Sequence, residues 1–194
     1  MKLTYLAGAW TSERPVYFPN NGDLLDFYAY HPYEEGVDPT GIVFSVGEDQ
    51  SSQSKFSRSD LMKTYSCENV KIRQPVNLSF YHTLALVHIE VLGASDPGLT
   101  ATLLSCMPET RMNLADNLPL SGSGTTVEIA MLRLEEDPQT ATSYTYRAIV
   151  PAQTIAAGTV FALFEGAGKK YEMKLQSEFR LRASVVEPVS VSIP

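Results

Sequence analysis

The clearest hydrophobic pattern in the chain lies between Pro75 and Val91. Over its first part apolar residues recur at every second position, which predicts a β-strand with one buried face. After Leu86 the apolar residues change to the odd positions. Since a shift of one residue moves every side chain to the other face, this change predicts a β-bulge near Ala85 to Val87. The two apolar sets are Val76, Leu78, Phe80, Leu84 and Leu86, and then Val87, Ile89 and Val91.

Similar alternation recurs along much of the chain, and clusters of Gly, Pro, Asn, Asp and Ser separate the segments. Short alternating runs bounded by such clusters predict β-strands joined by turns. No segment shows a convincing amphipathic helical period. The pattern therefore predicts an all-β fold built of β-sandwiches. The expected strands include Leu25–Ala29, Ile42–Val46, Leu99–Cys106, Val127–Met131, Tyr144–Val150, Val160–Glu165, Tyr171–Leu175 and Val189–Ile193.

Composition narrows the function classes. The 194 residues suffice for one large or two small domains, and 44% hydrophobic with 19% charged residues is ordinary for a globular protein. A formal net charge of -7 leaves no basic surplus to neutralise nucleic acid or an anionic membrane. No apolar run is long enough to span a bilayer, and the first ten residues resemble neither a signal peptide nor a lipoprotein leader.

The run F-Y-H-T-L-A-L-V-H-I-E-V at Phe80–Val91 resembles the signature strand of the bacterial fimbrillin-like proteins, which are subunits and tip adhesins of type V pili. Three further segments resemble the family in the same order: Phe27–Tyr33, Asp49–Met62 and Ala148–Gly158. The segment beginning at Phe179 resembles another short sequence motif of the family, although Ser184 stands where the family has Gly.

The resemblance implies tandem transthyretin-like β-sandwich domains, the first one incomplete. Residues 1–74 would be the later part of the N-terminal domain, and residues 75–194 the C-terminal domain. The family is exported as lipoproteins to the outer membrane, so the full-length form is expected at the cell surface in a fimbrium. A leader is absent from these residues.

By the same resemblance, the expected function is that of a structural or adhesive pilus subunit. Its partners would be other pilin subunits, joined by β-strand addition, together with host or bacterial surface ligands. An added strand forms main-chain ladder bonds, and its alternate side chains fill pockets. We expect Val189–Ile193 to be a donated or groove-lining strand, with Val189, Val191 and Ile193 as the plugs. Whether the subunit belongs to the stalk, tip or anchor stays open.

An alternative from another class is a secreted carbohydrate-binding β-sandwich. Tyr28, Tyr30 and Tyr33 would form its platform, because tyrosine offers an apolar face and a hydrogen-bonding tip. The simpler interpretation is that these side chains cover a sheet, since half-buried strands select aromatic residues.

No motif predicts catalysis, a cofactor or a metal site. There is no G-x-S-x-G elbow, and the Gly168-Lys169 loop lacks the first Gly and the Ser or Thr of a phosphate-binding loop. His82 falls on the predicted apolar face, so we expect a core histidine. His82 and His88 would lie about 20 Å apart along a strand, too far to share a metal. A hidden hydrolase, with a histidine beside a nucleophile in a cleft, ranks last.

Two pairs of residues leave alternatives open. Asp49 and Asp60 could share a cation, but pinning their loop is the better hypothesis, because hard cations need several closely spaced oxygen ligands. Cys67 and Cys106 could form a disulfide, and two unpaired thiols are favoured.

Overall fold

A computed structural model describes residues 1–15, 17–19, 21–65, 67–94, 96–116, 118, 120–134 and 143–193. Within these ranges the chain forms nineteen strands and one short helix, so the all-β prediction is confirmed. No helix in the described part of the chain is long and apolar enough to cross a membrane.

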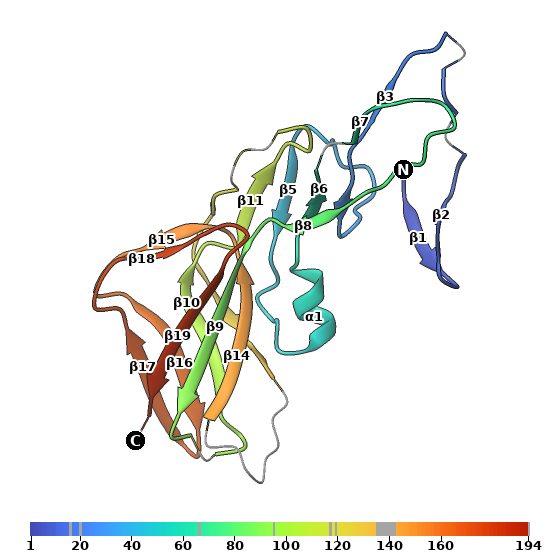
Figure 1. The fold of residues 1–194 in the computed structure, drawn as a ribbon. Helices are drawn as coiled ribbons and strands as arrows, with labels where there is room; N and C mark the ends of the chain where they lie inside the picture. The colour runs from blue at the N-terminus through green and yellow to red at the C-terminus, as the bar shows by residue number, and fades with distance from the viewer. Residues whose placement is uncertain are drawn as a thin grey trace.

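Two four-stranded sheets form the body of the molecule and face each other as a sandwich (Figure 1). The first sheet has the order β13 (Leu132–Arg133), β14 (Ser143–Val150), β9 (Ala85–Leu92) and β19 (Val186–Ser192). The second has the order β12 (Val127–Ala130), β10 (Thr100–Cys106), β16 (Val160–Gly166) and β17 (Lys169–Lys174). The hairpin of β16 and β17 turns at Ala167 and Gly168, as the glycine-bearing loop predicts.

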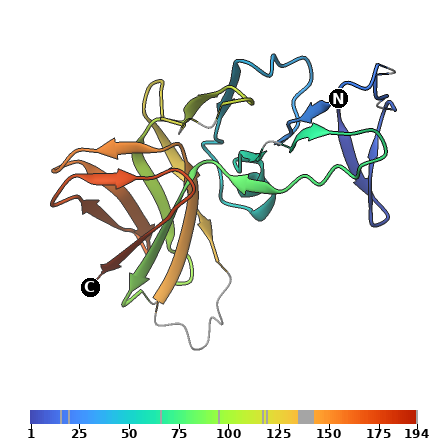
Figure 2. The ribbon, with the colours of Figure 1, turned by 45° about the horizontal axis from the view of Figure 1, so that its top comes forward.

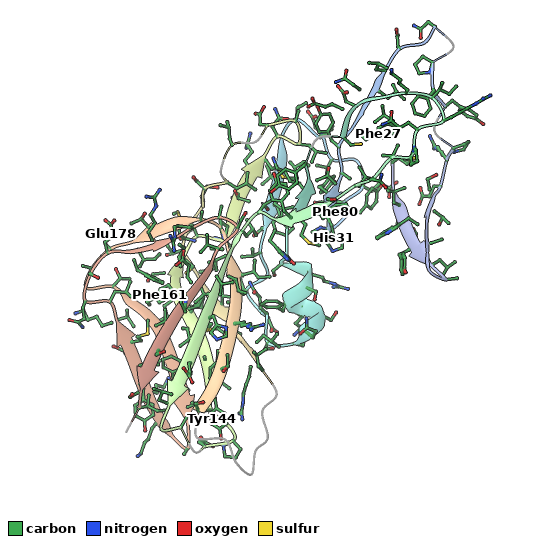
Figure 3. The ribbon with its side chains drawn as sticks, viewed as in Figure 1. Phe27, His31, Phe80, Tyr144, Phe161 and Glu178 are labelled. Carbon is green, nitrogen blue, oxygen red and sulfur yellow. The ribbon has the colours of Figure 1, made fainter. Side chains whose placement is uncertain are left out.

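The core lies between the two sheets. Alternate side chains of β9 are completely buried, and they share one hydrophobic cluster with Leu103, Ile129 and Phe164 from the opposite sheet. The ring centroids of Tyr146 and Phe164 lie 6.4 Å apart. Figure 3 shows Phe161 in the sandwich, far from Phe27 at the other end of the molecule. The alternation in the sequence therefore marks the faces of this sandwich correctly. The buried residues of β9 are Ala85, Val87, Ile89 and Val91.

The predicted bulge near Ala85 to Val87 is wrong. Strand β9 pairs with β14 in unbroken register from Ala85 opposite Val150 to Leu92 opposite Ser143. The change of phase has another cause: the chain leaves one sheet at β8 (Phe80–His82) and enters another at β9. Thr83 and Leu84 between them are both buried, and this junction shifts the apolar residues by one position.

The stretch before β8 also differs from its prediction. Residues 75–79 form no strand, and the side chains of Val76 and Phe80 are exposed. His82 is exposed rather than buried in the core, and its Nδ1 lies 2.8 Å from Asp60 Oδ1. The alternation there arises without a buried face, because residues 75–79 lie outside the strands and β8 is only the edge strand of a small sheet.

Smaller sheets extend from one end of the sandwich toward the N-terminus (Figures 1 and 2). Their innermost residues, Ile42, Leu61 and Met112, belong to the same hydrophobic cluster as the sandwich. Residues 1–15 are all exposed. The division at residue 74 stays a prediction. The remaining elements are β1 (Leu3–Leu6), β2 (Ala9–Ser12), β3 (Leu25–Phe27), β4 (Tyr30–His31), β5 (Ile42–Ser45), α1 (Gln53–Arg58), β6 (Met62–Thr64), β7 (Cys67–Val70), β11 (Glu109–Met112), β15 (Gln153–Ile155) and β18 (Phe179–Leu181).

Candidate functional site at the open edge of the sandwich

Strand β19 forms one edge of the first sheet and lies parallel to β9, from Val186 beside Leu86 to Ser192 beside Leu92. The two other ladders of that sheet are antiparallel. The turn before β19 sets this direction. Ser184 has a φ of 60° and donates its backbone N–H to Leu84 O at 2.9 Å, so the chain arrives beside the start of β9.

The inward apolar side chains are Val189 and Val191 of β19 and Ile193 just after the strand, and all three are half-buried against the hydrophobic core. Ser190 and Ser192 between them are exposed. The structure thus places the three predicted plug residues against the core, two in β19 and one directly after it.

Strand β17 is the corresponding edge of the second sheet, and it lies on the same side of the sandwich as β19 in both views (Figures 1 and 2). Its inward residues Tyr171 and Met173, and Leu175 just after it, are also half-buried. Tyr171 and Ile193 line a shared cavity of about 140 Å³. We call β17 and β19, with these half-buried apolar residues, the open edge of the sandwich.

The backbone N–H and C=O groups of β19 point in two opposite directions. Val185 O accepts from Leu86 N at 3.0 Å, and Ile193 N donates to Leu92 O at 3.1 Å. Odd-numbered residues therefore point their polar backbone groups at β9, and the even-numbered residues point theirs away from it. Pro188 is one of the even-numbered residues, so the outer ladder lacks one N–H donor at that position. Among the described strands, β19 pairs with β9 alone.

An ion pair between the buried Glu187 and the exposed Arg182 holds the start of β19. The Glu187 side chain is 6% exposed, and its Oε1 accepts from Arg182 Nε at 2.8 Å and from the Arg182 backbone N–H at 3.1 Å. The hydrogen bond from the Arg182 guanidinium lowers the pKa of Glu187. Because the charge is paired and hydrogen-bonded, it can occupy an inward position of the strand.

The two strands of the open edge differ in charge. Strand β17 carries the exposed Lys169, Lys170 and Lys174, with Lys170 Nζ 2.5 Å from Glu165 Oε1. Exposed lysines are a common protection against unwanted pairing at an edge strand. Strand β19 has no lysine or arginine. An added strand therefore meets fewer charges along β19 than along β17.

The three tyrosines of the alternative platform lie in the N-terminal part of the molecule. Tyr30 is half-buried against the core, and its hydroxyl donates to Glu34 O at 3.1 Å. The side chains of Tyr28 and Tyr33 are 37% and 43% exposed. Within the described residues, no ring contact joins any two of the three. Their use as a glycan platform stays a prediction.

The family model of the proteins described as fimbrillin-like matches residues 1–192. This chain belongs to the fimbrillin-like family. The resemblance found in the sequence is therefore confirmed. No curated protein sequence matches the chain.

Solved structures share the fold of this fimbrillin-like protein. A "putative cell adhesion protein" of Bacteroides uniformis has a TM-score of 0.68 and 22% identity, over 97% of this chain and 74% of that one. Another of that description, from Bacteroides ovatus, has a TM-score of 0.73 and 17% identity, over 95% and 70%. A fimbrial protein of Bacteroides ovatus has a TM-score of 0.56 and 14% identity, over 98% and 40%. The family suggests a pilus subunit or adhesin at the cell surface.

Asp49 and Asp60 of the fimbrillin-like chain have structural partners. Asp49 accepts from the backbone N–H and hydroxyl of Ser51 and from Lys55, whereas Asp60 pairs with His82. Asp49 thus pins its loop, as the preferred hypothesis has it. Within the described residues there is no cluster of three or more His, Cys, Asp or Glu side chains that could hold a metal ion.

His88 and the cysteines are likewise held in the fold. His88 Nδ1 lies 3.1 Å from Arg147 Nε, and burial, with Arg147, lowers the pKa of His88. Cys67 and Cys106 are free thiols, and burial raises the pKa of Cys106 to about 12. A thiol with so high a pKa is a poor nucleophile at neutral pH.

Sequence reasoning missed the stacked pair Tyr65 and Tyr81. Their ring centroids lie 4.3 Å apart at an interplanar angle of 26°. The two residues are sixteen positions apart and meet only through the pairing of β6 with β8. Periodicity along one strand carries no signal for such a pair.

Proposed function

We propose that this fimbrillin-like chain is a structural or adhesive subunit of a bacterial surface pilus and that it assembles with other subunits by β-strand complementation at the open edge. In full length it would be exported as a lipoprotein and reside in a fimbrium at the outer membrane. One observation carries the proposal: the C-terminal strand β19 is an edge strand whose plug residues Val189, Val191 and Ile193 are only half-buried.

Half-buried apolar side chains leave free energy to be gained by association. Fully burying a valine or isoleucine contributes about 1.5–3 kcal/mol, so covering the exposed part of each plug would add roughly 1 kcal/mol. Ladder hydrogen bonds to the outer backbone groups of Val186, Ser190 and Ser192 would fix the direction of an added strand. The same plugs would act if β19 left β9 and entered a neighbouring subunit, so both the groove-lining and the donated version depend on them.

A charge on the inward face tests the proposal against a matched charge on the outward face. We expect Val191→Asp to abolish self-association, because a carboxylate cannot enter an apolar cleft without a large desolvation cost. Ser192→Asp adds the same charge to the same strand on its exposed face and should leave association nearly unchanged. Light scattering coupled to size exclusion gives the readout, and circular dichroism verifies that both variants are folded.

Truncation gives a second test of the same strand. Removing residues 185–194 should also abolish association, because both the plugs and the edge backbone are lost. Self-association that survives the truncation and Val191→Asp would refute the assignment of β19.

A further inference from the structure

A second recess lies where the sandwich meets the smaller sheets, and it contains none of the plug residues. It has a volume of about 490 Å³. Its lining residues come from β6 and β8 on one side and from β15 and β18 with the turn that follows on the other, together with Leu118, Leu120 and Ser121. A volume of this size suits a small organic molecule, since ligand pockets commonly measure about 300–1,000 Å³.

The lining of this recess is basic. Lys63, Arg180 and Arg182 contribute to it, and none of the lining residues is Asp or Glu. This is unexpected in a chain with 22 acidic and 15 basic residues. Cations converging on a cavity without lining carboxylates attract an anion.

The three cations differ in how far the protein already compensates them. Glu187 pairs with Arg182. Lys63 is 3% exposed, and its ammonium donates to the backbone carbonyl of Asp116 while no carboxylate of the described residues forms a salt bridge with it. Arg180 is exposed and has no hydrogen-bond or ion-pair partner among the described side chains.

A buried ammonium whose contacts are a backbone carbonyl and the Tyr81 ring is costly compared with one that contacts a carboxylate. The carboxylate of Asp116 acts on Lys63 from nearby and favours its charge, but burial dominates and lowers the pKa of Lys63. A ligand anion that reached Lys63 and Arg180 together would supply the missing charge through charge-assisted hydrogen bonds.

The rest of the lining selects the body of the ligand. Tyr81 presents a ring that stacks on Tyr65, and Lys63 Nζ lies 5.9 Å from the centroid of the Tyr81 ring. Thr154 and Ser184 line the other wall, and the Ser184 hydroxyl, which donates to His82 O at 2.5 Å, keeps its capacity to accept a hydrogen bond. An aromatic face beside hydroxyl groups suits a sugar ring, which offers C–H groups on one side and hydroxyls at its rim.

From this arrangement we propose that the recess binds a saccharide that carries a carboxylate or sulfate group. The acidic group lies against Lys63 and Arg180, and the ring lies against Tyr81. The proposal stands apart from strand complementation, because none of the plug residues lines this recess.

The test is a calorimetric titration of the folded chain with glucuronate, glucose 6-sulfate, glucose and inorganic sulfate. We expect binding of glucuronate or glucose 6-sulfate and at least tenfold weaker binding of glucose. An oligosaccharide with a terminal glucuronate then distinguishes a chain end from a free monosaccharide, and binding of either supports the proposal.

Two charge-matched variants assign the site. Arg180→Gln should weaken binding of the acidic sugar about tenfold or more, as expected for a lost charge-assisted hydrogen bond. Arg58→Gln removes the same charge from α1, outside the recess, and should change affinity less than twofold. Arg180 is exposed, so its replacement leaves the fold intact.

Several outcomes would overturn the proposal: no heat with either acidic sugar, equal binding of glucose, binding of inorganic sulfate alone, or equal losses in both variants. Binding of a peptide carboxylate without binding of the acidic sugars would also refute it, since the recess would then serve a different class of partner.

Discussion

The Gln50 side chain joins the loop after β5 to strand β14 of the sandwich. Gln50 is 0% exposed, and its side chain bonds both polar backbone groups of Ile149: Oε1 accepts from the N–H at 2.8 Å, and Nε2 donates to the carbonyl at 2.8 Å. Ile149 faces β9 on one side, so Gln50 takes the place of a neighbouring strand on the other. The segment Asp49–Met62, which resembles the family, therefore has a physical role: its Gln50 side chain pairs with the backbone of β14.

We expect Gln50→Leu to destabilise the fold by about 2–4 kcal/mol, because two buried backbone groups of β14 lose their partners. Urea unfolding followed by circular dichroism measures the change. Gln53→Leu, on the exposed surface of α1, is the matched control and should stay within about 0.5 kcal/mol of the parent. Equal effects of the two substitutions would contradict this role for Gln50.

At the scale of elements, the strand β19 is held in place by the pair of Glu187 and Arg182. Because folding lowers the pKa of Glu187, the pair contributes stability above the unfolded pKa of glutamate, and this contribution is lost as the pH falls through the lower folded pKa. Protonation also leaves Arg182 without its charge partner. The attachment of β19 should therefore weaken in acid.

The pH dependence of thermal stability measures the contribution of this ion pair. The melting temperature of the parent should fall progressively below about pH 4.5. Glu187→Gln should have a lower melting temperature at pH 7 and a smaller decrease in acid. Melting temperatures between pH 3 and 7 measure both. Glu172→Gln, exposed on β17, serves as the control. A parallel decline in all three proteins would show that other groups cause the acid sensitivity.

The positions of most elements in the sandwich could be predicted from alternation. Strands β9, β10, β14 and β16 follow runs with alternating or continuous apolar residues, because each buries one face against the opposite sheet. The run before β9 misled the prediction, because a transfer of the chain between sheets shifts the phase as a bulge would. His82 was misplaced for the same reason.

At the scale of the whole molecule, burial is concentrated in the sandwich. The odd-numbered residues of β9 are 0% exposed, whereas the hairpin of β1 and β2 is exposed throughout. Local stability follows such differences, since segments with little buried apolar area open at a small free-energy cost. The N-terminal hairpin should therefore unfold independently of the sandwich.

Trp10 allows this to be measured, because it is the one tryptophan of the chain and is 65% exposed. We expect the emission of a hydrated indole in the folded protein, full access to acrylamide, and little change when urea removes the β-sheet signal. Trp10→Phe identifies the tyrosine background. Blue-shifted emission protected from the quencher would show that the hairpin is covered in solution.

The sequence by itself determined the fold class, the family and the inward face of β19, because alternation and short sequence motifs depend only on neighbours along the chain. Only the tertiary structure decided that β19 runs parallel to β9, that Glu187 pairs across a turn, and that Lys63, Tyr81 and Arg180 surround one recess. These facts depend on which strands become neighbours. That choice is made by packing between segments far apart in the chain, and periodicity carries no record of it.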